Sequence, residues 1–332
     1  MTVGIKDVAR VAGVSPATVS RVLGNGVVSD ALRAQVEAAV RETGYRPNLS
    51  ARRLRSRHSQ TIGLIVADIR NPFFTAVSRA VEDAAYRAGL RVILCNTDEN
   101  PEKEAMYLRL MEEERVTGVI FAPTRRTVEQ MAETSRSFPT VLIDRACQRS
   151  REDTVVLDNA AAAGVLVEHL YDRGYRRIAG LFGNASTTGI ERHDGYRAAM
   201  ERLGLAPDAV FIPPAAEAAE AELRRRTVDA GAASRRPEAI IASNGLLLMG
   251  VVRAAGEAGL AIPGDLAVAG FDNERWTELV GPGITVIEQP VEAIGRAAME
   301  MLLDRIDTPD APVRKLVLNG RCIVRGSTAK RT

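Results

Sequence analysis

Residues 5–25 read IKDVARVAGVSPATVSRVLGN, and their pattern sets the character of the N-terminal part of the chain. The apolar residues at helical spacing are Ile5, Val8, Ala9 and Ala12. They predict a helix that ends at Gly13. Ser15 then supplies a hydroxyl cap, and Pro16 takes the first position of a second helix that runs to Leu23. The pattern therefore predicts two helices joined by a tight turn.

The second helix has the composition of a helix that enters the major groove of DNA. Pro16 and Ala17 carry little bulk at its start, so the backbone can approach the bases. Arg21 can donate two hydrogen bonds to O6 and N7 of guanine, and Ser15 and Thr18 are placed for phosphate contacts. We predict a helix-turn-helix unit that binds double-stranded DNA. The alternative is an ordinary three-helix bundle with a solvated basic face.

Charge is distributed unevenly along the chain. Residues 1–60 contain ten Lys or Arg and four Asp or Glu, a formal charge of +6. The total is +2, so the remaining 272 residues carry −4. A small basic unit attached to a mildly acidic body indicates a polyanionic partner for the N-terminal unit alone.

Cysteine usage and hydropathy indicate a cytoplasmic protein. Cys95, Cys147 and Cys322 are far apart and lack the spacing of a metal site, so we expect free thiols in a reducing compartment. The N-terminus has no apolar run typical of a secretory signal. No stretch reaches the ~18 apolar residues of a membrane helix, and we expect no membrane partner.

From residue 61 onward, apolar strands alternate with amphipathic helices. The first two strands read TIGLIVA at 61–67 and RVILCN at 91–96, and the alternation starts again after Asn159. Continuous apolar strands between helices predict parallel sheets with helices on both faces. We therefore expect two α/β halves, which typically bind small ligands at the carboxyl ends of their strands, in the cleft between them.

The sequence contains no constellation of residues typical of an enzyme. Gly180 and Gly183 do not complete a dinucleotide-binding fingerprint, and no GK[ST] motif follows a strand. The three histidines, His58, His169 and His193, are scattered, so we expect them in packing or at the surface. We expect a protein that is not an enzyme and that uses neither a cofactor nor a metal ion.

Over nearly its full length the chain closely resembles the LacI family of bacterial transcription repressors. The residues that carry the resemblance are the stretch at 5–25 and GYRPNLSARRL at 44–54, followed by the α/β body. The resemblance implies an all-α helix-turn-helix headpiece at 1–45, a hinge helix and linker at 46–60, and a sensor at 61–332. The sensor would be a two-lobed α/β domain similar to ribose-type periplasmic binding proteins. Its implied N-lobe covers about 61–159 and 288–318, and its C-lobe about 160–287 and 319–332.

The resemblance also implies a role for the hinge. In the family, a short helix forms here when two subunits lie side by side on DNA, and a leucine from each kinks the duplex. Leu54 matches that leucine, and Ala51 matches the small residue that permits close approach. A helix this short is unstable by itself in water. A change in the spacing of the two sensors would therefore unfold it and weaken DNA binding. The alternative is a flexible basic linker. The implied DNA-binding residues are Ser15, Pro16, Ala17, Thr18, Arg21, Asn25, Ala51, Leu54 and Arg55.

For the sensor, the resemblance implies a pocket for a small polar effector. The rings of Phe73 and Phe74 would pack on the C–H face of a sugar, and charged side chains would hold its hydroxyls by the stronger kind of hydrogen bond. Alternatively, both rings belong to the core, and Asp272 is a structural residue after its strand. The implied effector-binding residues are Asn71, Phe73, Phe74, Asp144, Arg145, Arg192, Asn244, Asp272 and Gln289.

The sequence departs from the ribose-type pattern at three places. Ala122 stands where the pattern has an amide, IPPAAEAA at 212–219 lacks the aromatic residue, and Gly245 stands where an aspartate usually follows Asn244. These changes either leave room for a larger ligand or weaken the pocket. We expect a pentose or related polyol rather than a purine, and both induction and co-repression fit the architecture.

We expect a ligand-responsive repressor that binds a pseudo-palindromic operator as a homodimer. No leucine heptads follow the last predicted strand, RCIVRGS at 321–327, and such heptads form the tetramers of some relatives. The competing class is a sugar-binding module of a transport system without a DNA function. The basic headpiece argues against that class.

Overall fold

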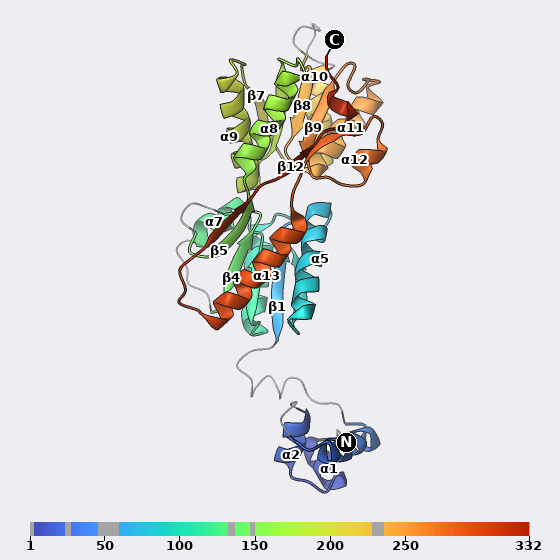
Figure 1. Ribbon diagram of the computed structural model, residues 1–332, viewed down its shortest axis with the longest axis vertical. Helices are drawn as coiled ribbons and strands as arrows, with labels where there is room; N and C mark the ends of the chain where they lie inside the picture. The colour runs from blue at the N-terminus through green and yellow to red at the C-terminus, as the bar shows by residue number, and fades with distance from the viewer. Residues whose placement is uncertain are drawn as a thin grey trace. The chain divides into compact units, whose positions relative to one another are not determined.

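The computed structural model describes residues 3–23, 28–45, 60–131, 137–146, 150–227 and 236–331 (Figure 1). The chain divides into two compact units, Met1–Ser59 and Gln60–Thr332. Four predicted DNA-binding residues lie outside the described residues: Asn25, Ala51, Leu54 and Arg55. Their predicted roles, and that of the hinge, remain predictions.

The N-terminal unit consists of three short helices around a small apolar core. They are α1 (Ile5–Val11), α2 (Pro16–Leu23) and α3 (Asp30–Thr43). Their buried apolar residues are Val8, Ala9, Ala12, Val19, Val22, Val36 and Ala39. Gly13 lies between α1 and α2 with φ +63°, a left-handed conformation that glycine adopts readily. The local signals therefore set the tight turn, and α2 begins and ends at the predicted residues.

The N-lobe of the second unit is a six-stranded parallel sheet in the order β11-β5-β4-β3-β1-β2. Its strands are β1 (Thr61–Val66), β2 (Arg91–Asn96), β3 (Gly118–Phe121), β4 (Thr140–Ile143), β5 (Asp153–Leu157) and β11 (Lys315–Leu318). The helices α5 (Pro72–Arg87) and α13 (Val291–Asp307) pack in one apolar cluster with the sheet. A second cluster holds α6 (Pro101–Glu113) and α7 (Arg125–Met131).

The C-lobe repeats this plan with the strand order β12-β10-β9-β8-β6-β7, and among its described strand pairs only β10–β12 is antiparallel. Its strands are β6 (Ile178–Gly183), β7 (Asp208–Ile212), β8 (Ala239–Ala242), β9 (Ala267–Phe271), β10 (Thr285–Glu288) and β12 (Arg321–Ile323). The helices α8 (Asn159–Asp172) and α9 (Thr187–Arg202) share one core cluster. The helices α10 (Ala216–Thr227) and α11 (Gly245–Glu257) share another.

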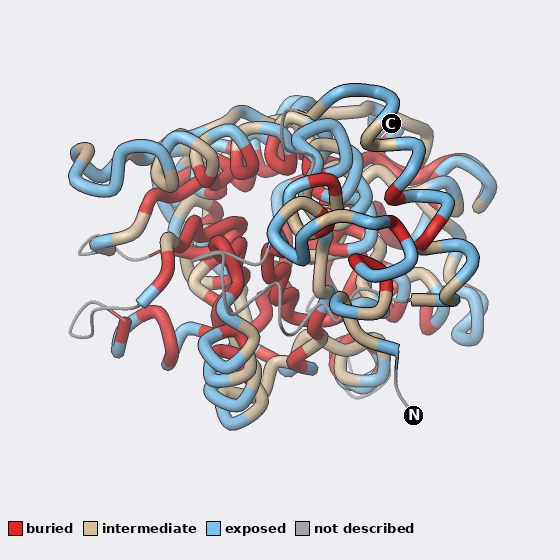
Figure 2. The backbone as a smooth tube through the Cα atoms, turned by 90° about the horizontal axis from the view of Figure 1, so that it is seen from below, coloured by how far each residue is buried: buried red, intermediate tan, exposed pale blue. Residues whose placement is uncertain are grey.

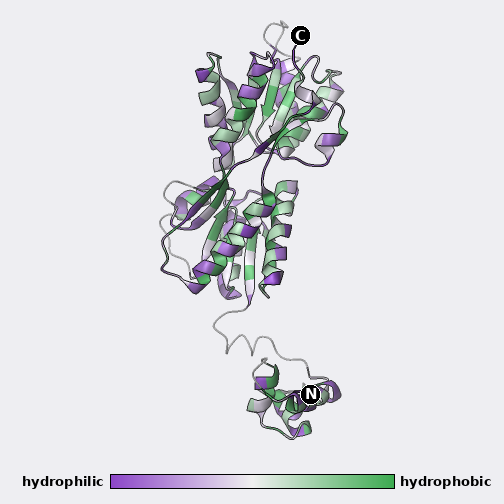
Figure 3. Cartoon of the chain, in the orientation of Figure 1, coloured by the Kyte–Doolittle hydropathy of each residue, from purple (hydrophilic) through white to green (hydrophobic). Residues whose placement is uncertain are grey.

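The chain passes between the lobes three times, after β5, after β10 and after β11. Asp158 donates its backbone N–H to the carbonyl of Leu318 at 2.8 Å, which ties the first crossing to the third. The strands β1, β3, β4, β5, β6, β8 and β9 are buried at every residue (buried segments are red in Figure 2), and the apolar residues gather on the strands (Figure 3). Among the described residues, no helix is both long enough and apolar enough to cross a membrane.

The α/β fold class is confirmed, but four strands were not predicted. They are β5, β7, β10 and β11, all of four or five residues. In β7 and β11 most residues are half-buried or exposed, so neither strand is buried along its length as the central strands are. Apolar spacing predicts helices that start at Val128 and Ile190, but α7 and α9 each begin three residues earlier, because capping rather than apolar spacing sets these starts. The helix α9 begins at Thr187, where Ser186 accepts a hydrogen bond from the N–H of Gly189 at 3.2 Å.

Candidate functional site

The predicted DNA-binding residues at the start of α2 and Arg21 near its end are accessible to solvent. Ser15, Pro16, Ala17 and Arg21 are exposed, and Thr18 is half-buried. The Oγ of Ser15 accepts the N–H of Thr18 at 3.1 Å and lies 2.9 Å from its hydroxyl. Ser15 therefore caps the helix, and its role is at least partly structural.

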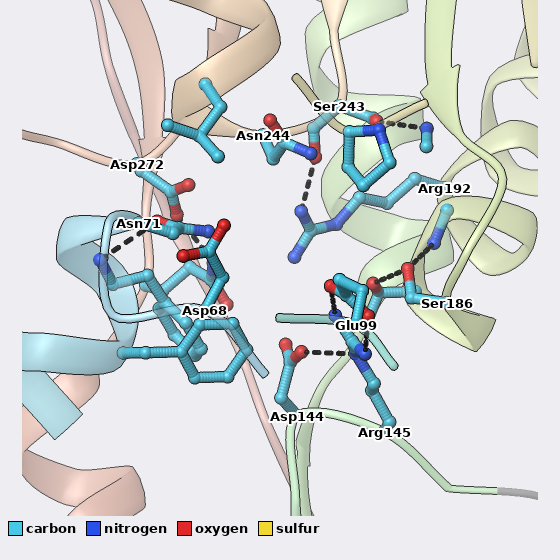
Figure 4. Close-up of a pocket in the computed structure, with 18 residues that line it drawn as sticks. Asp68, Asn71, Glu99, Asp144, Arg145, Ser186, Arg192, Ser243, Asn244 and Asp272 are labelled. Carbon is cyan, nitrogen blue, oxygen red and sulfur yellow. Dashed lines mark hydrogen bonds and ion pairs between the residues drawn. The ribbon is translucent and has the colours of Figure 1, made fainter. Parts of the chain in front are cut away.

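A cavity of about 550 Å³, including its opening to solvent, lies between the two lobes (Figure 4). All nine predicted effector-binding residues line it: Asn71, Phe73, Phe74, Asp144, Arg145, Arg192, Asn244, Asp272 and Gln289. Sequence reasoning missed the other nine lining residues: Asp68, Glu99, Gly183, Ser186, Thr188, Gly189, Pro214, Ser243 and Leu246. Several of these sit in loops after strands, a position that could have identified them. Ala122 is buried but is not among the lining residues.

Three helix N-termini border the cavity through their capping residues. The Oδ1 of Asn71 accepts the N–H of Phe73 at 3.1 Å at the start of α5. The Oδ1 of Asn244 accepts the N–H of Leu247 at 2.8 Å at the start of α11, and Ser186 caps α9. Each asparagine oxygen already accepts one capping hydrogen bond, so the amide NH2 groups are the donors that these side chains can offer to a ligand.

Arg145 is almost fully buried and is already paired. Its Nη1 and Nη2 donate to the two carboxylate oxygens of Glu99 at 2.6 and 2.5 Å, and its Nε donates to Asp144 at 3.2 Å. Burial opposes the charge of Arg145, but Glu99 and Asp144 outweigh it and raise the pKa of the guanidinium. The guanidinium of Arg145, which the resemblance implies binds the effector, is therefore held by Glu99 and Asp144.

Arg192 presents an unpaired donor. Its Nε donates to Oδ1 of Asn159 at 2.8 Å, its Nη1 donates to the carbonyl of Ser243, and its guanidinium lies 4.0 Å from the ring centroid of Phe271. Its Nη2 is buried and has no hydrogen-bond partner among the described residues. Burial lowers the pKa of Arg192, and the charges of the two cavity aspartates oppose this shift.

Asp272 and Gln289 form the acceptor side of the cavity. Asp272 Oδ1 accepts from Nε2 of Gln289 at 2.7 Å, and its Oδ2 accepts the backbone N–H of Gly245 at 2.9 Å. The Oε1 of Gln289 is buried and unpaired within the described part of the chain. A hydroxyl group both donates and accepts, so hydroxyls of a ligand could satisfy this oxygen and the Nη2 of Arg192.

Phe73 and Phe74 belong to both the core and the cavity wall. They pack edge to face with ring centroids 5.1 Å apart and are part of the N-lobe core. Both also line the cavity. The two alternatives raised by the sequence are therefore compatible for these rings.

Metal binding has no support in the described ranges, where no group of three or more His, Cys, Asp or Glu side chains is placed to hold an ion. His169 lies 2.7 Å from the hydroxyl of Thr328, and His193 packs on Phe211. Both histidines are therefore packing residues, away from the cavity.

Comparison with known proteins agrees with this architecture. Residues 4–48 match bacterial regulatory proteins of the lacI family, and residues 167–328 match a periplasmic binding protein-like domain. The HTH-type transcriptional regulator KdgR of Bacillus subtilis (strain 168) is 36% identical over 97% of both chains. The HTH-type transcriptional repressor PurR of Serratia proteamaculans (strain 568) is 34% identical over 98% of this chain and 96% of its own.

Solved structures share the fold. A lac repressor dimer bound to operator and an anti-inducer covers 99% of this chain and 100% of its own, with a TM-score of 0.87 at 23% identity. A periplasmic binding protein/LacI transcriptional regulator from Alkaliphilus metalliredigens, complexed with D-xylulofuranose, has a TM-score of 0.71 at 26% identity. It covers 81% of this chain and 98% of its own.

A helix-turn-helix unit followed by a two-lobed binding domain defines a DNA-binding transcription regulator. The chain belongs to the LacI family of bacterial regulatory proteins. Its relatives are transcription regulators rather than enzymes, and they disfavour the alternative of a transport module.

Proposed function

We propose that this regulator is a dimeric repressor in the cytoplasm and that a small polar effector in the sensor cavity sets its affinity for a pseudo-palindromic operator. A pentose or a related sugar is the favoured effector. The observation that carries the proposal is a pair of buried, unpaired polar atoms on two residues that line the cavity, Nη2 of Arg192 and Oε1 of Gln289. A buried polar atom without a partner costs roughly 1–3 kcal/mol, and a bound polyol would remove both penalties.

The composition of the wall supports a sugar in particular. Aromatic rings at Phe73 and Phe74 offer a flat apolar surface, while carboxylates at Asp144 and Asp272 offer acceptors on both lobes. Sugars need this combination because their C–H faces are apolar and their hydroxyl rims are polar. The sugar bound to the Alkaliphilus metalliredigens structure is consistent with this choice.

Coupling between the cavity and DNA would follow from the connections between the lobes. Asn71 and Phe74 lie on the N-lobe, whereas Arg192 and Asp272 lie on the C-lobe. A ligand that contacts both lobes favours one relative position of them over others. In a dimer this position would set the spacing of the two hinge segments, and so the formation of the hinge helices on the operator.

The test for the effector is calorimetric titration of the full chain with D-ribose, followed by a panel of pentoses and polyols. We expect saturable binding that Asp272→Ala abolishes. Asp310→Ala changes an exposed carboxylate and is the matched control, because it should bind as the unchanged protein does. The absence of heat with every sugar would reject this effector class.

The test for DNA recognition is selection of duplexes from a random pool by the full chain. We expect a pseudo-palindromic consensus, bound by two chains in analytical ultracentrifugation. Binding should weaken steeply with salt, as expected from roughly 6–10 phosphate contacts. A consensus without two-fold symmetry, or one chain per duplex, would contradict the dimer.

A further inference from the structure

Glu274 lies in the loop between β9 and α12 (Trp276–Leu279) and holds an incompletely paired carboxyl group. Its Oε2 accepts the indole N–H of Trp276 at 2.8 Å. Its Oε1 is buried and has no hydrogen-bond partner in the described ranges. An inward carboxyl oxygen without a donor is uncommon in proteins and calls for an explanation.

The space that this carboxyl occupies exists because residue 245 is a glycine. A Cβ added at Gly245 would lie 2.6 Å from Oε1 of Glu274 and 3.3 Å from Oδ2 of Asp272. The N–H of Gly245 also donates to that same Oδ2 at 2.9 Å. The first residue of α11 therefore lies beside both the effector-site residue Asp272 and the carboxyl of Glu274.

Glu274 also lines a second cavity, which opens beside the first. Phe73, Asp272 and Gln289 line both cavities. Glu274 thus lines a cavity that shares the acceptor residues of the effector site, Asp272 and Gln289. Solvent in this second cavity gives the carboxyl of Glu274 access to protons.

We propose that Glu274 is a positioning residue of the effector site, whose carboxyl occupies the space beside Gly245 and braces Asp272 against the first turn of α11. The inference rests on the proposed function of the cavity, because it assigns Glu274 an influence on effector affinity. Glu274 acts through Asp272 and is not itself among the residues that line the effector cavity.

The electrostatics make this brace sensitive to protons. Burial, with a smaller contribution from Asp272, raises the pKa of Glu274 to about 7, against the opposing effect of its hydrogen bond from Trp276. A neutral carboxyl packs beside Asp272 without repulsion, whereas an ionised one repels it. Effector affinity should therefore fall as pH rises through about 7. The other charged residues that line the second cavity are Arg79, Arg275, Glu288, Glu292 and Arg296.

The first test needs no effector, because Trp276 is the only tryptophan in the chain and bonds directly to Glu274. Its fluorescence in the full chain should titrate with a midpoint near pH 7. Glu274→Gln should abolish the transition, and Asp272→Asn should shift it to lower pH by removing the neighbouring charge. The proposal would be overturned if the fluorescence transition were still present in Glu274→Gln, or if its midpoint pH were unchanged in Asp272→Asn.

The second test measures D-ribose affinity by calorimetry on the full chain. Glu274→Ala and Gly245→Ala should each weaken binding on the order of tenfold, which is what one hydrogen bond of ordinary strength contributes. The double variant should be no weaker than either, because both changes remove the same carboxyl from its place. Glu274→Gln should bind with an affinity independent of pH between 6 and 8.

Glu292→Gln is the matched control, since it changes an exposed carboxyl on the same second cavity and should leave affinity unchanged. Additive losses in the double variant would show that Gly245→Ala acts on Asp272 directly and would overturn the brace. If the unchanged protein binds neither D-ribose nor any other sugar of the panel, the pentose proposal fails. The fluorescence titration and its Asp272→Asn shift then decide the role of Glu274 alone.

Discussion

Asp144 and Asp272 occupy equivalent positions on opposite lobes and share a backbone conformation rare for residues other than glycine. Asp144 follows β4 with φ +64°, and Asp272 follows β9 with φ +77°. Each donates its N–H to the next strand, Asp144 to Val155 at 3.1 Å and Asp272 to Ile287 at 2.9 Å. Such conformations cost on the order of 1 kcal/mol each and gather at functional sites. The repeated turn aims one carboxylate from each lobe into the same cavity.

Asp272→Asn should separate effector binding from folding. Asparagine tolerates a positive φ, so the turn after β9 should form as before. The loss of negative charge should weaken D-ribose binding at least about tenfold, because hydrogen bonds to charged groups are the stronger kind. Calorimetry and urea unfolding should show lower affinity with little change in stability. The variant should bind the selected DNA as before, but D-ribose should no longer change this binding. A loss of DNA binding would contradict the assignment of Asp272 to the effector site.

Glu99→Ala should destabilise the sensor because it leaves Arg145 buried without its main partner. Their side chains are 18% and 5% exposed, so solvent cannot replace the ion pair. Breaking a buried pair from one side costs about 3–5 kcal/mol, and urea unfolding measures this loss. Glu168→Ala is the control, since it removes an exposed pair with Arg202 and should cost less than about 1 kcal/mol. Equal losses in the two variants would refute the structural role of the Glu99–Arg145 pair.

Leu54→Ala tests the hinge, which lies outside the described residues, so this prediction comes from the sequence and the family alone. If Leu54 inserts into the minor groove, its truncation should weaken binding to selected DNA on the order of tenfold. D-ribose affinity should not change, because residue 54 is outside the sensor. Fluorescence anisotropy and calorimetry measure the two affinities. An equal loss of both would contradict the wedge.

Glu274→Gln should make stability less dependent on pH. The pKa of Glu274 is about 7 in the folded protein and near 4.5 when unfolded. The folded state therefore binds more protons between these values, and its stability falls as pH rises from about 4.5 to about 7. The Tm of the variant should exceed that of the unchanged protein at pH 8 by more than at pH 5. A Tm difference that is the same at both pH values would show that Glu274 does not titrate in this window.

Through its resemblance to the family, the sequence identified the nine effector-site candidates. The spacing of these residues along the chain gives no information on how their side chains interact. Arg145 is one example, because its partner Glu99 lies 46 residues earlier in the loop after β2. Glu274 is another, since only the meeting of its loop with α11 places its carboxyl against Gly245. No motif marks either contact.

What the sequence determined by itself is local or compositional. Apolar periodicity, the Ser15-Pro16 cap and the turn at Gly13 are sufficient for the helix-turn-helix, because each depends on residues a few positions apart. Continuous apolar strands between helices are sufficient for parallel sheets. Only the tertiary structure decided which polar atoms on the cavity wall remain unpaired. That outcome depends on three chain crossings and on two lobes that bring distant residues within hydrogen-bonding distance, which no short-range pattern encodes.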